Sequence, residues 1–320
     1  MKPGVCTGAV LLLLSLCACT PVPQPPLMVG TVPWAGSEPL FLAREQGAFP
    51  SERIRLVEYL SSADMIRAFR NGAIDAVALT LEEALRLEAL GLEPRVVLVM
   101  DASHGADCVV ARPEVKTLAE LRGRRVALEN MPLGLFMLGR ALERVGLRPE
   151  DVQRVPTRLD SHLEVYRRGE VDAVVSFEPN CQRLVDAGAH VLFDSSLIPG
   201  EILDVLVVRG SYLAAHPERI DMLLRGWFAA LDDQNAHPDE AARIMAPRLG
   251  LDARRFREAL AGVDLLDARE QREQLTGPAP RLRETSQRLR AVMSENGLLP
   301  EGPREDSRLL DASSLLRVSP

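Results

Sequence analysis

Short runs of apolar residues alternate with amphipathic stretches of helical period along most of the chain. Residues 76–79 and 95–100 are almost unbroken apolar runs, and residues 81–90 between them have the spacing of a helix that begins after Thr80. Such runs are typical of strands buried on both faces of a mainly parallel sheet. Their repeated alternation with helices predicts right-handed strand–helix–strand units and an α/β fold.

One segment of this pattern occurs twice. Residues 63–78 and residues 160–175 match in one fixed register, and Gly72 of the first copy corresponds to Gly169 of the second. Each copy predicts an amphipathic helix that ends at the glycine, then a short apolar strand and a polar turn that opens another helix. The chain is therefore predicted to form two similar α/β lobes, and the cleft between them is the expected place for a ligand.

Two segments predict where the chain crosses between the lobes. In residues 101–112, two strand-like runs follow one another with no helix between them, and residues 204–209 form another largely apolar strand. We expect the first segment to carry the chain into the second lobe and the other to bring it back. Lobe one is then predicted to comprise residues 27–104 and 206–298, and lobe two residues 105–205.

Beyond residue 211 the pattern becomes helical. Residues 217–235, 238–249, 252–263 and 280–295 show helical periodicity after starting Pro, Asp or Ser signals. These helices are predicted to pack on lobe one. Residues 299–320 are polar and contain proline, so we expect a loose or weakly docked tail.

The first 26 residues have the pattern of a targeting segment and a tether. The apolar run at residues 10–16 is too short to span a bilayer as a mature helix. Leu16-Cys-Ala-Cys19 resembles a bacterial lipobox, so residues 1–18 are predicted to be a signal peptide and Cys19 to carry a lipid that anchors the protein to the membrane. The Pro-rich residues 19–26 would be an extended tether. An ordinary cleaved signal peptide is the alternative.

Composition excludes few functions. Hydrophobic residues make up 47% of the 320 residues and charged residues 26%, which are ordinary values for a globular protein. The net charge of −7 and the lack of a basic, aromatic-rich segment argue against broad nucleic-acid binding. The five histidines are scattered and no Cys/His cluster has metal-ligand spacing, so we expect neither a structural metal nor a cofactor.

Cleavage before Cys19 would leave Cys108 and Cys181 as the cysteines within the lobes. An oxidising compartment would permit a disulfide bond between them. They lie in different predicted elements, however, and no local spacing supports their pairing. Two buried free thiols are therefore the preferred interpretation.

Several segments resemble the substrate-binding proteins of bacterial ABC transporters, in the group that includes nitrate, sulfonate and taurine receptors and the thiamine-pyrimidine-precursor proteins. The resemblance covers roughly residues 27–265 and is carried by residues 34–47, 72–80, 105–113, 118–126 and 169–179. It implies a type II periplasmic-binding-protein fold whose two lobes close on a solute. It also implies docking to the permease and ATPase subunits of a membrane transporter, and a monomer is expected.

Ligands of open α/β sheets bind beyond the carboxyl ends of strands, beside helix N-termini that carry free N–H groups. The residues that the predicted elements place there, or near the crossings, form the candidate ligand-binding set: Trp34, Ser61, Asp64, Thr80, Ser103, Asn130, Met131, Asp160, Glu178 and Asp204. Trp34 is the strongest candidate because it lies in a turn, where a large flat side chain can wall a site. A Trp that fills the interior of lobe one is the alternative.

Helix capping competes with ligand binding at the polar candidates. Glu178 and Thr80 lie at nearly the same place in the two lobes, and each is equally compatible with ligand contact and with capping of the following helix. Asp64 and Asp160 are better explained as caps. Capping is also the safer interpretation of Ser61.

The candidate set contains several acids and no basic residue. A pocket for an isolated sulfonate or nitrate would use Arg, Lys or many free N–H groups, whereas acids favour an amine or a heterocyclic N–H with its ring against Trp34. We therefore expect an amine-bearing or heterocyclic small molecule, such as a pyrimidine. Helix termini alone can hold an anion, so a sulfonate or taurine receptor stays the alternative.

Two other functions use the same fold. Some proteins of this fold make a pyrimidine from pyridoxal phosphate and a histidine, which requires a lysine to hold the cofactor. Lys116 is the only lysine after the predicted signal peptide and lies outside the predicted cleft turns, so we expect no enzyme. A sensory lipoprotein that reports solute binding to a membrane signalling protein stays open, because it would use the same cleft.

Overall fold

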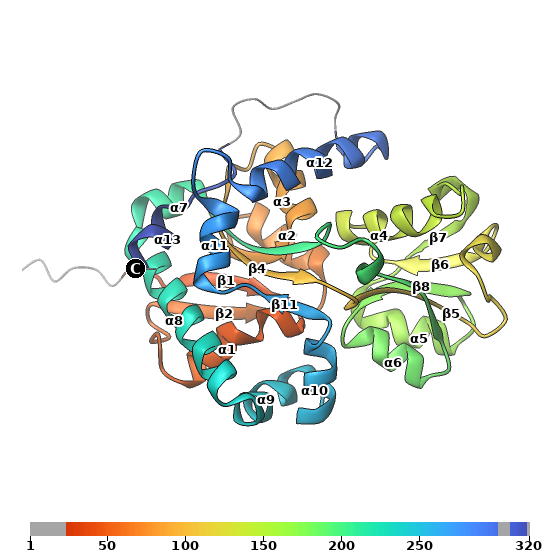
Figure 1. The fold of residues 1–320 in the computed structure, drawn as a ribbon, viewed down its shortest axis with the longest axis horizontal. Helices are drawn as coiled ribbons and strands as arrows, with labels where there is room; N and C mark the ends of the chain where they lie inside the picture. Colours follow the sequence, from red (N-terminus) through yellow and green to blue (C-terminus); the bar gives the residue numbers. More distant parts are fainter. Residues whose placement is uncertain (1–23, 300–307, 319–320) are drawn as a thin grey trace, which may run out of the picture.

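The structure is a computed structural model that describes residues 24–299 and 308–318. The predicted signal peptide, Cys19 and most of the predicted tether lie outside these ranges. Two α/β lobes lie side by side (Figure 1). Within the described ranges, no helix combines the length and the apolar character needed to span a bilayer.

The described strands form two sheets, one in each lobe. The sheet of lobe one has the order β11-β4-β10-β3-β1-β2, and that of lobe two the order β7-β6-β8-β5-β9. The strands are β1 (Leu27–Thr31), β2 (Ile54–Glu58), β3 (Ala76–Thr80), β4 (Pro94–Ser103), β5 (Asp107–Ala111), β6 (Arg125–Leu128), β7 (Gln153–Pro156), β8 (Ala173–Phe177), β9 (His190–Asp194), β10 (Leu203–Arg209) and β11 (Val263–Leu265).

Strand β3 lies inside the sheet of lobe one, between β1 and β10. β1 pairs in parallel with β2 and β3, whereas β10 is antiparallel to β3 and β4. All residues of β3 are buried, as the apolar run at residues 76–79 predicts. The sheet is mixed rather than mainly parallel because β10 brings the chain back from lobe two in the opposite direction.

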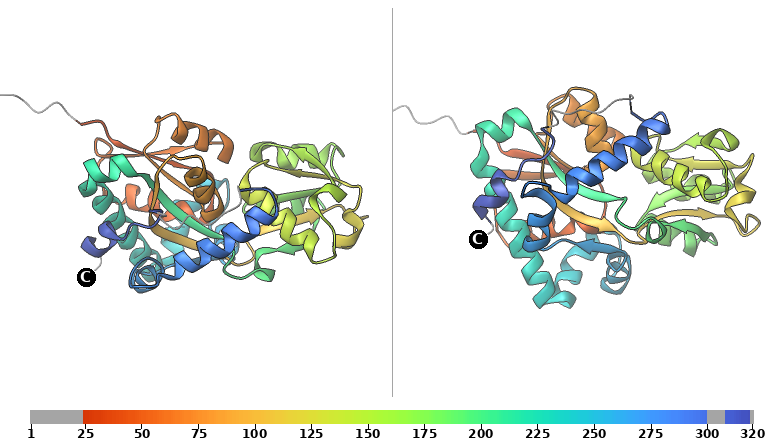
Figure 2. Two further views of the ribbon diagram at one scale, coloured as in Figure 1. Left: turned by 90° about the horizontal axis from the view of Figure 1, so that it is seen from above. Right: turned by 45° about the horizontal axis from the view of Figure 1, so that its top comes forward.

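The helices that follow β10 mostly cover lobe one, as the sequence predicts. α8 packs on α1 and α9, while α12 lies over α3 and reaches toward α4 of lobe two (Figures 1 and 2). The helices are α1 (Glu38–Glu45), α2 (Ser62–Arg70), α3 (Leu81–Ala89), α4 (Pro132–Glu143), α5 (His162–Arg167), α6 (Asn180–Asp186), α7 (Gly210–Ala215), α8 (Pro217–Ala236), α9 (Pro238–Met245), α10 (Ala253–Leu260), α11 (Ala268–Leu275), α12 (Arg281–Glu295) and α13 (Ser313–Val318).

The two copies of the sequence repeat take up the same place in the two lobes. The first copy forms α2 and β3, and the second forms α5 and β8. Gly72 and Gly169 follow the helices with φ angles of 73° and 74°. Glycine adopts this left-handed conformation without the steric cost of a Cβ. Each glycine therefore ends its helix and directs the chain toward the buried strand.

The chain crosses between the lobes twice, as predicted. It leaves lobe one between β4 and β5 and returns between β9 and β10. The two crossings contact each other, because the Ser195 hydroxyl lies 2.7 Å from the Ser103 hydroxyl and accepts a hydrogen bond from the Gly105 N–H at 2.7 Å. Two short connections held together in this way can act as a hinge between the lobes.

The described part of the C-terminal tail is docked on lobe one. Leu309 is buried, and Leu310 forms a bridge with β4. α13 packs on α8, and Arg317 donates two hydrogen bonds of 2.8 Å to the Asp221 carboxylate. Of the loose or weakly docked tail that the sequence left open, the described residues are docked, because a few apolar side chains and one ion pair anchor them.

Candidate functional site

A cavity lies at the carboxyl end of β1 and β3 and faces lobe two. We call it cavity one. Its polar lining includes Thr80, Glu83, Asp107 and Asp204, and its aromatic lining is Trp34 and Phe177. Both lobes contribute to this lining, as expected of a cleft that closes on a ligand.

A second cavity, cavity two, continues toward lobe two. Lobe two adds the side chains of Glu129, Met131 and His162 to its lining. Five residues line both cavities: Ser62, Glu83, Asp107, Leu133 and Phe177. The two cavities are therefore neighbouring parts of one interlobe site.

Trp34 forms a wall of cavity one and is fixed by two contacts. Its indole Nε1 donates a hydrogen bond to Asp101 Oδ2 at 3.1 Å, and its ring meets the Phe177 ring edge-on, with the centroids 5.7 Å apart. Gly36 permits the first contact, because a Cβ there would lie 2.0 Å from Asp101 Oδ2. The Trp-Ala-Gly segment thus holds an aromatic surface where the two lobes meet.

The N-terminus of α3 places Thr80 and Glu83 in the lining of cavity one. The two residues form a capping box: the Glu83 N–H donates to Thr80 Oγ1 at 3.4 Å, and the Thr80 N–H donates to Glu83 Oε2 at 3.3 Å. The capping box uses one carboxyl oxygen of Glu83. Glu83 also lines both cavities.

Buried carboxyl groups dominate the polar lining. Burial raises the pKa of Glu83 to about 8, and the nearby Glu129 carboxyl adds to this effect. Burial also raises the pKa of Asp107 to about 7. The pKa of Asp204 is raised well above its usual value by burial and by the neighbouring Asp101 and Asp107 carboxyls. Carboxyl groups that are shielded from water and crowd one another favour a bound positive charge.

No basic side chain balances these acids. Among the residues that the structure describes, those lining the two cavities include neither lysine nor arginine. The described ranges also hold no group of three or more His, Cys, Asp or Glu arranged for a metal ion. The polar lining that the structure describes thus consists of acidic side chains and uncharged ones such as Ser62, Thr80 and His162.

Contacts between the lobes surround the two cavities. Glu129 of lobe two and Ser62 of lobe one both line cavity two. Burial raises the pKa of Glu129 to about 7, and the nearby Ser62 opposes this shift. At the rim, Arg158 of lobe two forms an ion pair with Asp64 of lobe one, with an N–O distance of 2.6 Å. The lobes thus meet on the ligand side as well as at the crossings.

His162 contributes a neutral imidazole to cavity two. Its Nδ1 lies 3.0 Å from the Ser176 hydroxyl, and its Nε2 has no hydrogen-bond partner among the described residues. Burial lowers the pKa of His162 to about 4, against smaller opposing effects of the Thr157 backbone and Asp160. The ring is therefore uncharged at neutral pH, and Nε2 can bond a polar group of a ligand.

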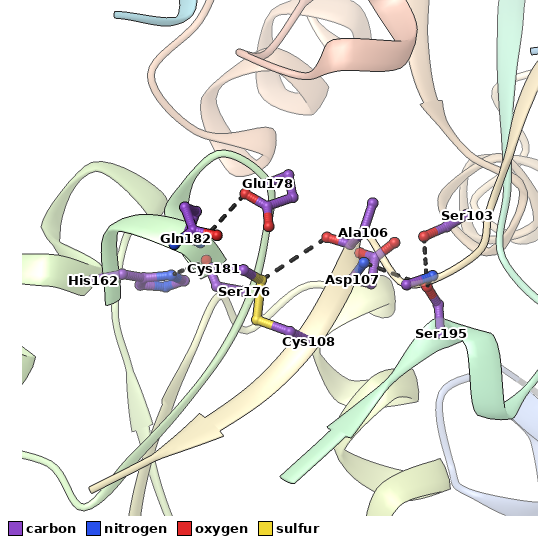
Figure 3. The surroundings of a disulfide bond; sticks show 11 residues. Ser103, Ala106, Asp107, Cys108, His162, Ser176, Glu178, Cys181, Gln182 and Ser195 are labelled. Atoms are coloured by element: carbon purple, nitrogen blue, oxygen red, sulfur yellow. Dashed lines mark hydrogen bonds between the residues drawn. A yellow bond between two sulfur atoms is a disulfide. The ribbon is translucent and has the colours of Figure 1, made fainter. Parts of the chain in front are cut away.

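A disulfide bond joins Cys108 of β5 to Cys181 of α6 beside the cavities (Figure 3). The prediction of two free thiols was wrong. β5 pairs with β8, and α6 begins shortly after β8, so the fold brings together two cysteines that are 73 residues apart. The disulfide follows Asp107 directly in the sequence and fixes the strand that carries this acid.

Glu178 lies beside the disulfide and lines neither cavity. Its Oε2 accepts a hydrogen bond from the Gln182 N–H at 3.3 Å, so Glu178 caps the first turn of α6. Burial raises its pKa. The preceding residue, Phe177, lines both cavities instead.

The structure brings four of the predicted site residues together. Trp34, Thr80 and Asp204 line cavity one, and Met131 lines cavity two. Trp34 also packs in the core of lobe one, as the alternative interpretation expects, while part of its side chain lines cavity one.

Three other predicted residues, Ser61, Asp64 and Asp160, lie outside both cavities. Ser61 Oγ accepts a hydrogen bond from the Asp64 N–H at 3.2 Å and caps α2. The carboxylate of Asp64 is held by Arg158, and Asp160 lies 3.4 Å from the same guanidinium. Their roles are helix capping and contact between lobes, because the polar turn faces the rim of the cleft.

Ser103 and Asn130 also lie outside the cavities. Ser103 belongs to the hydrogen-bonded pair of crossings with Ser195. Asn130 lines a separate surface hollow between α2, α3 and α4. A residue near the end of a strand can thus face a different side of the turn from its neighbours, which the sequence pattern does not resolve.

Glu83, Glu129 and Phe177 line the site but were absent from the predicted set. The spacing of Thr80 and Glu83 is that of a capping box, and this could have singled out Glu83. Glu129 is the first residue after β6, a position from which ligand contacts are expected. Phe177 corresponds to Thr80 in the sequence repeat, so comparison of the two copies could have found it.

Comparison with known proteins gives one family. The model described as the NMT1-like family matches residues 20–250. A taurine-binding periplasmic protein of Escherichia coli (strain K12) is 24% identical over 254 residues, which cover 76% of this chain and 79% of that protein.

Solved structures share the fold at low identity. The alkanesulfonate-binding protein SsuA of Xanthomonas axonopodis pv. citri, bound to MOPS, has a TM-score of 0.73 and 18% identity, with 92% of this chain and 98% of that chain covered. The desulfurization enzyme DSZB has a TM-score of 0.65 and 18% identity, with 92% of this chain and 99% of that chain covered. These likenesses show the fold of the periplasmic binding proteins.

Proposed function

The chain belongs to the NMT1-like family, and we propose that it is the solute-binding component of an ABC import system. In this role the two lobes close on a small solute in cavities one and two, and the closed monomer delivers it to the permease and ATPase subunits of the transporter. The double crossing supports this role because it lets the lobes move as units. The resemblance to a taurine-binding and an alkanesulfonate-binding protein agrees with it.

The proposed solute carries an amine or a nitrogen heterocycle with N–H donors, such as an aminopyrimidine. The carboxyl-rich lining carries this proposal: Glu83, Asp107, Glu129 and Asp204 line the cavities, and no lining residue that the structure describes is lysine or arginine. The rings of Trp34 and Phe177 add an aromatic surface suited to a flat or cationic group.

A sulfonate or taurine receptor is the second candidate. The relatives named for taurine and alkanesulfonate support it. Free N–H groups at helix N-termini can hold an anion without basic side chains. Taurine also carries an ammonium group, so an acid-rich cavity would suit one of its two ends.

Calorimetric titration with an aminopyrimidine, ethylamine, taurine and ethanesulfonate tests this proposal. We expect the nitrogen compounds to bind, with micromolar affinity corresponding to about −8 kcal/mol. Asp204→Asn should weaken their binding, whereas Asp160→Asn, an acid outside the cavities, should not. Binding of ethanesulfonate alone would favour the second candidate.

Binding rather than catalysis is proposed, although DSZB is an enzyme with this fold. Lys116 is exposed and lines neither cavity, so it is poorly placed to hold pyridoxal phosphate there. An absorbance titration with pyridoxal phosphate checks this point, because a Schiff-base band would contradict it.

We also propose that Cys19 is lipidated and anchors the protein to a membrane of the cell envelope, on the basis of the Leu16-Cys-Ala-Cys19 segment. Mass spectrometry of the mature protein, with Cys19→Ser as control, tests this. A sensory role would use the same lobes. Neighbouring permease and ATPase genes would support transport over sensing.

A further inference from the structure

The two lobes correspond to each other over more of the chain than the repeated segment alone. β1 pairs with β3 in the register in which β6 pairs with β8, at a constant offset of 97 residues. The return strand β10 keeps the same relation to β5. Asp204 of β10 lies opposite Thr80, and Asp107 of β5 lies opposite Phe177, again at this offset.

The correspondence includes side-chain contacts at the far end of these strands. The guanidinium of Arg209 lies over the Phe69 ring, 4.6 Å from its centroid, and that of Arg112 lies over the Tyr166 ring at 4.5 Å. The two pairs are again 97 residues apart. Positions at this offset around the central strands are therefore structurally equivalent in the two lobes.

Cavities one and two are lined from such equivalent positions. Each of three residues of cavity one has its equivalent in the lining of cavity two, and the pairs are Trp34 and Met131, Ala78 and Val175, and Thr80 and Phe177. The acids Glu83 and Asp107 line both cavities. The interlobe site thus consists of two equivalent half-sites with acids at their boundary.

At three further equivalent positions, lobe two has a polar side chain where lobe one has an apolar one. The residues of cavity one and their equivalents in cavity two are Val32 and Glu129, Met65 and His162, and Leu79 and Ser176. Met65 and Leu79 belong to the hydrophobic core, whereas His162 Nδ1 lies 3.0 Å from the Ser176 hydroxyl (Figure 3). None of the three polar residues is more than 9% exposed. Burying them costs free energy that apolar residues avoid at the equivalent positions, and a binding role accounts for the difference.

We propose that cavity two is a separate subsite for a neutral hydrogen-bonding group of the solute, a hydroxyl or a primary amide, and that Glu129, His162 and Ser176 determine this specificity. The amine of the solute lies at the shared acids Glu83 and Asp107, and its ring lies in cavity one. The solute is then an aromatic or heterocyclic amine that carries a hydroxyl or an amide beyond the amine. This inference rests on the proposed solute-binding function and deepens it.

A group that both donates and accepts hydrogen bonds suits the chemistry of cavity two. Burial lowers the pKa of His162 to about 4, so its imidazole is neutral at neutral pH, and its Nε2 has no hydrogen-bond partner among the described residues. A hydroxyl or an amide can donate to the Glu129 carboxyl and accept from an imidazole N–H. An apolar group would leave these polar atoms without partners, and a carboxylate would be repelled by an ionised Glu129.

Three related compounds test the subsite by calorimetric titration at about pH 8, where a carboxyl with a pKa of about 7 is mostly ionised. Phenethylamine carries a ring and an amine, phenylalaninol adds a hydroxymethyl group, and phenylalanine adds a carboxylate in its place. We expect the wild type to bind phenylalaninol at least about threefold more tightly than phenethylamine, as one added hydrogen bond would give. Phenylalanine should bind more weakly than phenylalaninol.

The variants introduce the residues of lobe one at the equivalent positions of lobe two. His162→Met/Ser176→Leu copies the Met65 and Leu79 pair, and Glu129→Val is an independent second variant in case the double variant does not fold. In either variant the ratio of phenylalaninol to phenethylamine affinity should fall to about one. Leu163→Ile is the matched control. It also introduces a residue of lobe one into α5, lines neither cavity, and should keep the ratio of the wild type.

Nuclear magnetic resonance of the imidazole nitrogens gives a second readout. The His162 signals, identified by their loss in the double variant, should shift when phenylalaninol binds and should shift less with phenethylamine. A wild type that binds phenylalaninol no more tightly than phenethylamine, or folded variants that keep the preference, would overturn the subsite. Tighter binding of phenylalanine than of phenylalaninol would also overturn it and would place an anion in cavity two. Solute binding itself fails only if the wild type binds neither these compounds nor those of the wider panel.

Discussion

At equivalent positions directly after their repeated units, the two lobes present side chains of different chemical character to the cavities. After β3, lobe one presents Thr80 and the carboxyl of Glu83 to the cavities. At the position corresponding to Thr80, lobe two presents Phe177, and the next acid, Glu178, turns away to cap α6. The same backbone arrangement therefore places a carboxyl group in the cavity lining from lobe one and an aromatic ring from lobe two. This pair of side chains would suit a solute that is both flat and charged.

A second difference concerns how each lobe is held together. Lobe two is cross-linked by the disulfide between Cys108 and Cys181, whereas residues 20–107 and 182–320 contain no cysteine. The cross-link joins β5 to α6, next to the acid Asp107 and the aromatic Phe177. Lobe two thus offers a wall fixed by a covalent bond, and lobe one a wall fixed by packing and by hydrogen bonds such as that of Trp34 to Asp101.

Removal of the disulfide should have the largest effect. We expect the double variant Cys108→Ser/Cys181→Ser to lose about 2–4 kcal/mol of unfolding free energy, because the bond closes a long loop of the unfolded chain. Urea unfolding of the variant and of the wild type, with and without reductant, measures this loss. Reductant should destabilise the wild type and leave the variant unchanged. Equal stability of all samples would show that the bond does not form in solution.

Neutralising Glu83 tests the charged side of the comparison. Glu83→Gln retains a side chain that can complete the capping box and removes the charge, so we expect amine affinity to fall by about tenfold or more, or roughly 1.5–3 kcal/mol. Titration calorimetry at about pH 9, where a carboxyl with a pKa of about 8 is mostly ionised, measures the change. Glu82→Gln is the control, because the adjacent Glu82 is equally buried with a pKa raised to about 8 but lines neither cavity. Equal losses in the two variants would indicate a general effect on lobe one.

The buried acids also predict opposite pH effects on ligand affinity and on stability. Burial raises the pKa of Asp107 and Glu129 to about 7 and that of Glu83 to about 8, so the empty folded protein holds protons that the unfolded chain releases. The unfolding free energy of the empty protein should therefore fall from about pH 5 to about pH 8. Over the same range the affinity for an amine should rise, because the cation binds the ionised carboxyls.

Thermal unfolding of the empty protein and calorimetric titration with ethylamine, both as a function of pH, measure these two trends. Asp107→Asn should flatten both curves, since it removes one of the titrating groups. A stability that rises with pH over this interval would mean that the acids are not buried as described. Ethylamine affinity that does not change with pH would mean that the amine binds elsewhere.

The sequence predicts the shared architecture of the lobes better than the side chains that distinguish them. Gly72 and Gly169 mark the helix ends because a left-handed backbone conformation is needed there, and glycine adopts it most easily. Both glycines take this left-handed φ. Apolar runs located β3 and β8. Phe177 lines the cavities, whereas the adjacent Glu178 caps α6. The hydrophobic periodicity of the sequence does not show which of two adjacent residues at the end of a strand will face the cavity.

The long-range contacts were the hardest to predict. Glu129 and Ser62, which both line cavity two, are far apart in the sequence, and so are the two cysteines of the disulfide. Nothing in the local sequence of one partner points to the other. The docked tail shows the same limit, because Leu309 is buried against a surface formed much earlier in the chain. Such contacts depend on how the helices and strands pack together in three dimensions, which the local sequence does not specify.

The ion pair between Arg158 and Asp64 should have the smallest effect, although it joins the two lobes directly. Both side chains are partly exposed, and exposed pairs contribute roughly 0–1 kcal/mol. Arg158→Ala should therefore weaken amine binding by less than about fivefold, with the difference fading at high salt. Arg168→Ala, which breaks the exposed pair with Glu164 within lobe two, should leave affinity unchanged. A loss of more than about tenfold in Arg158→Ala would mean that closure depends on the rim of the cleft rather than on the buried carboxyls and rings that distinguish the two lobes.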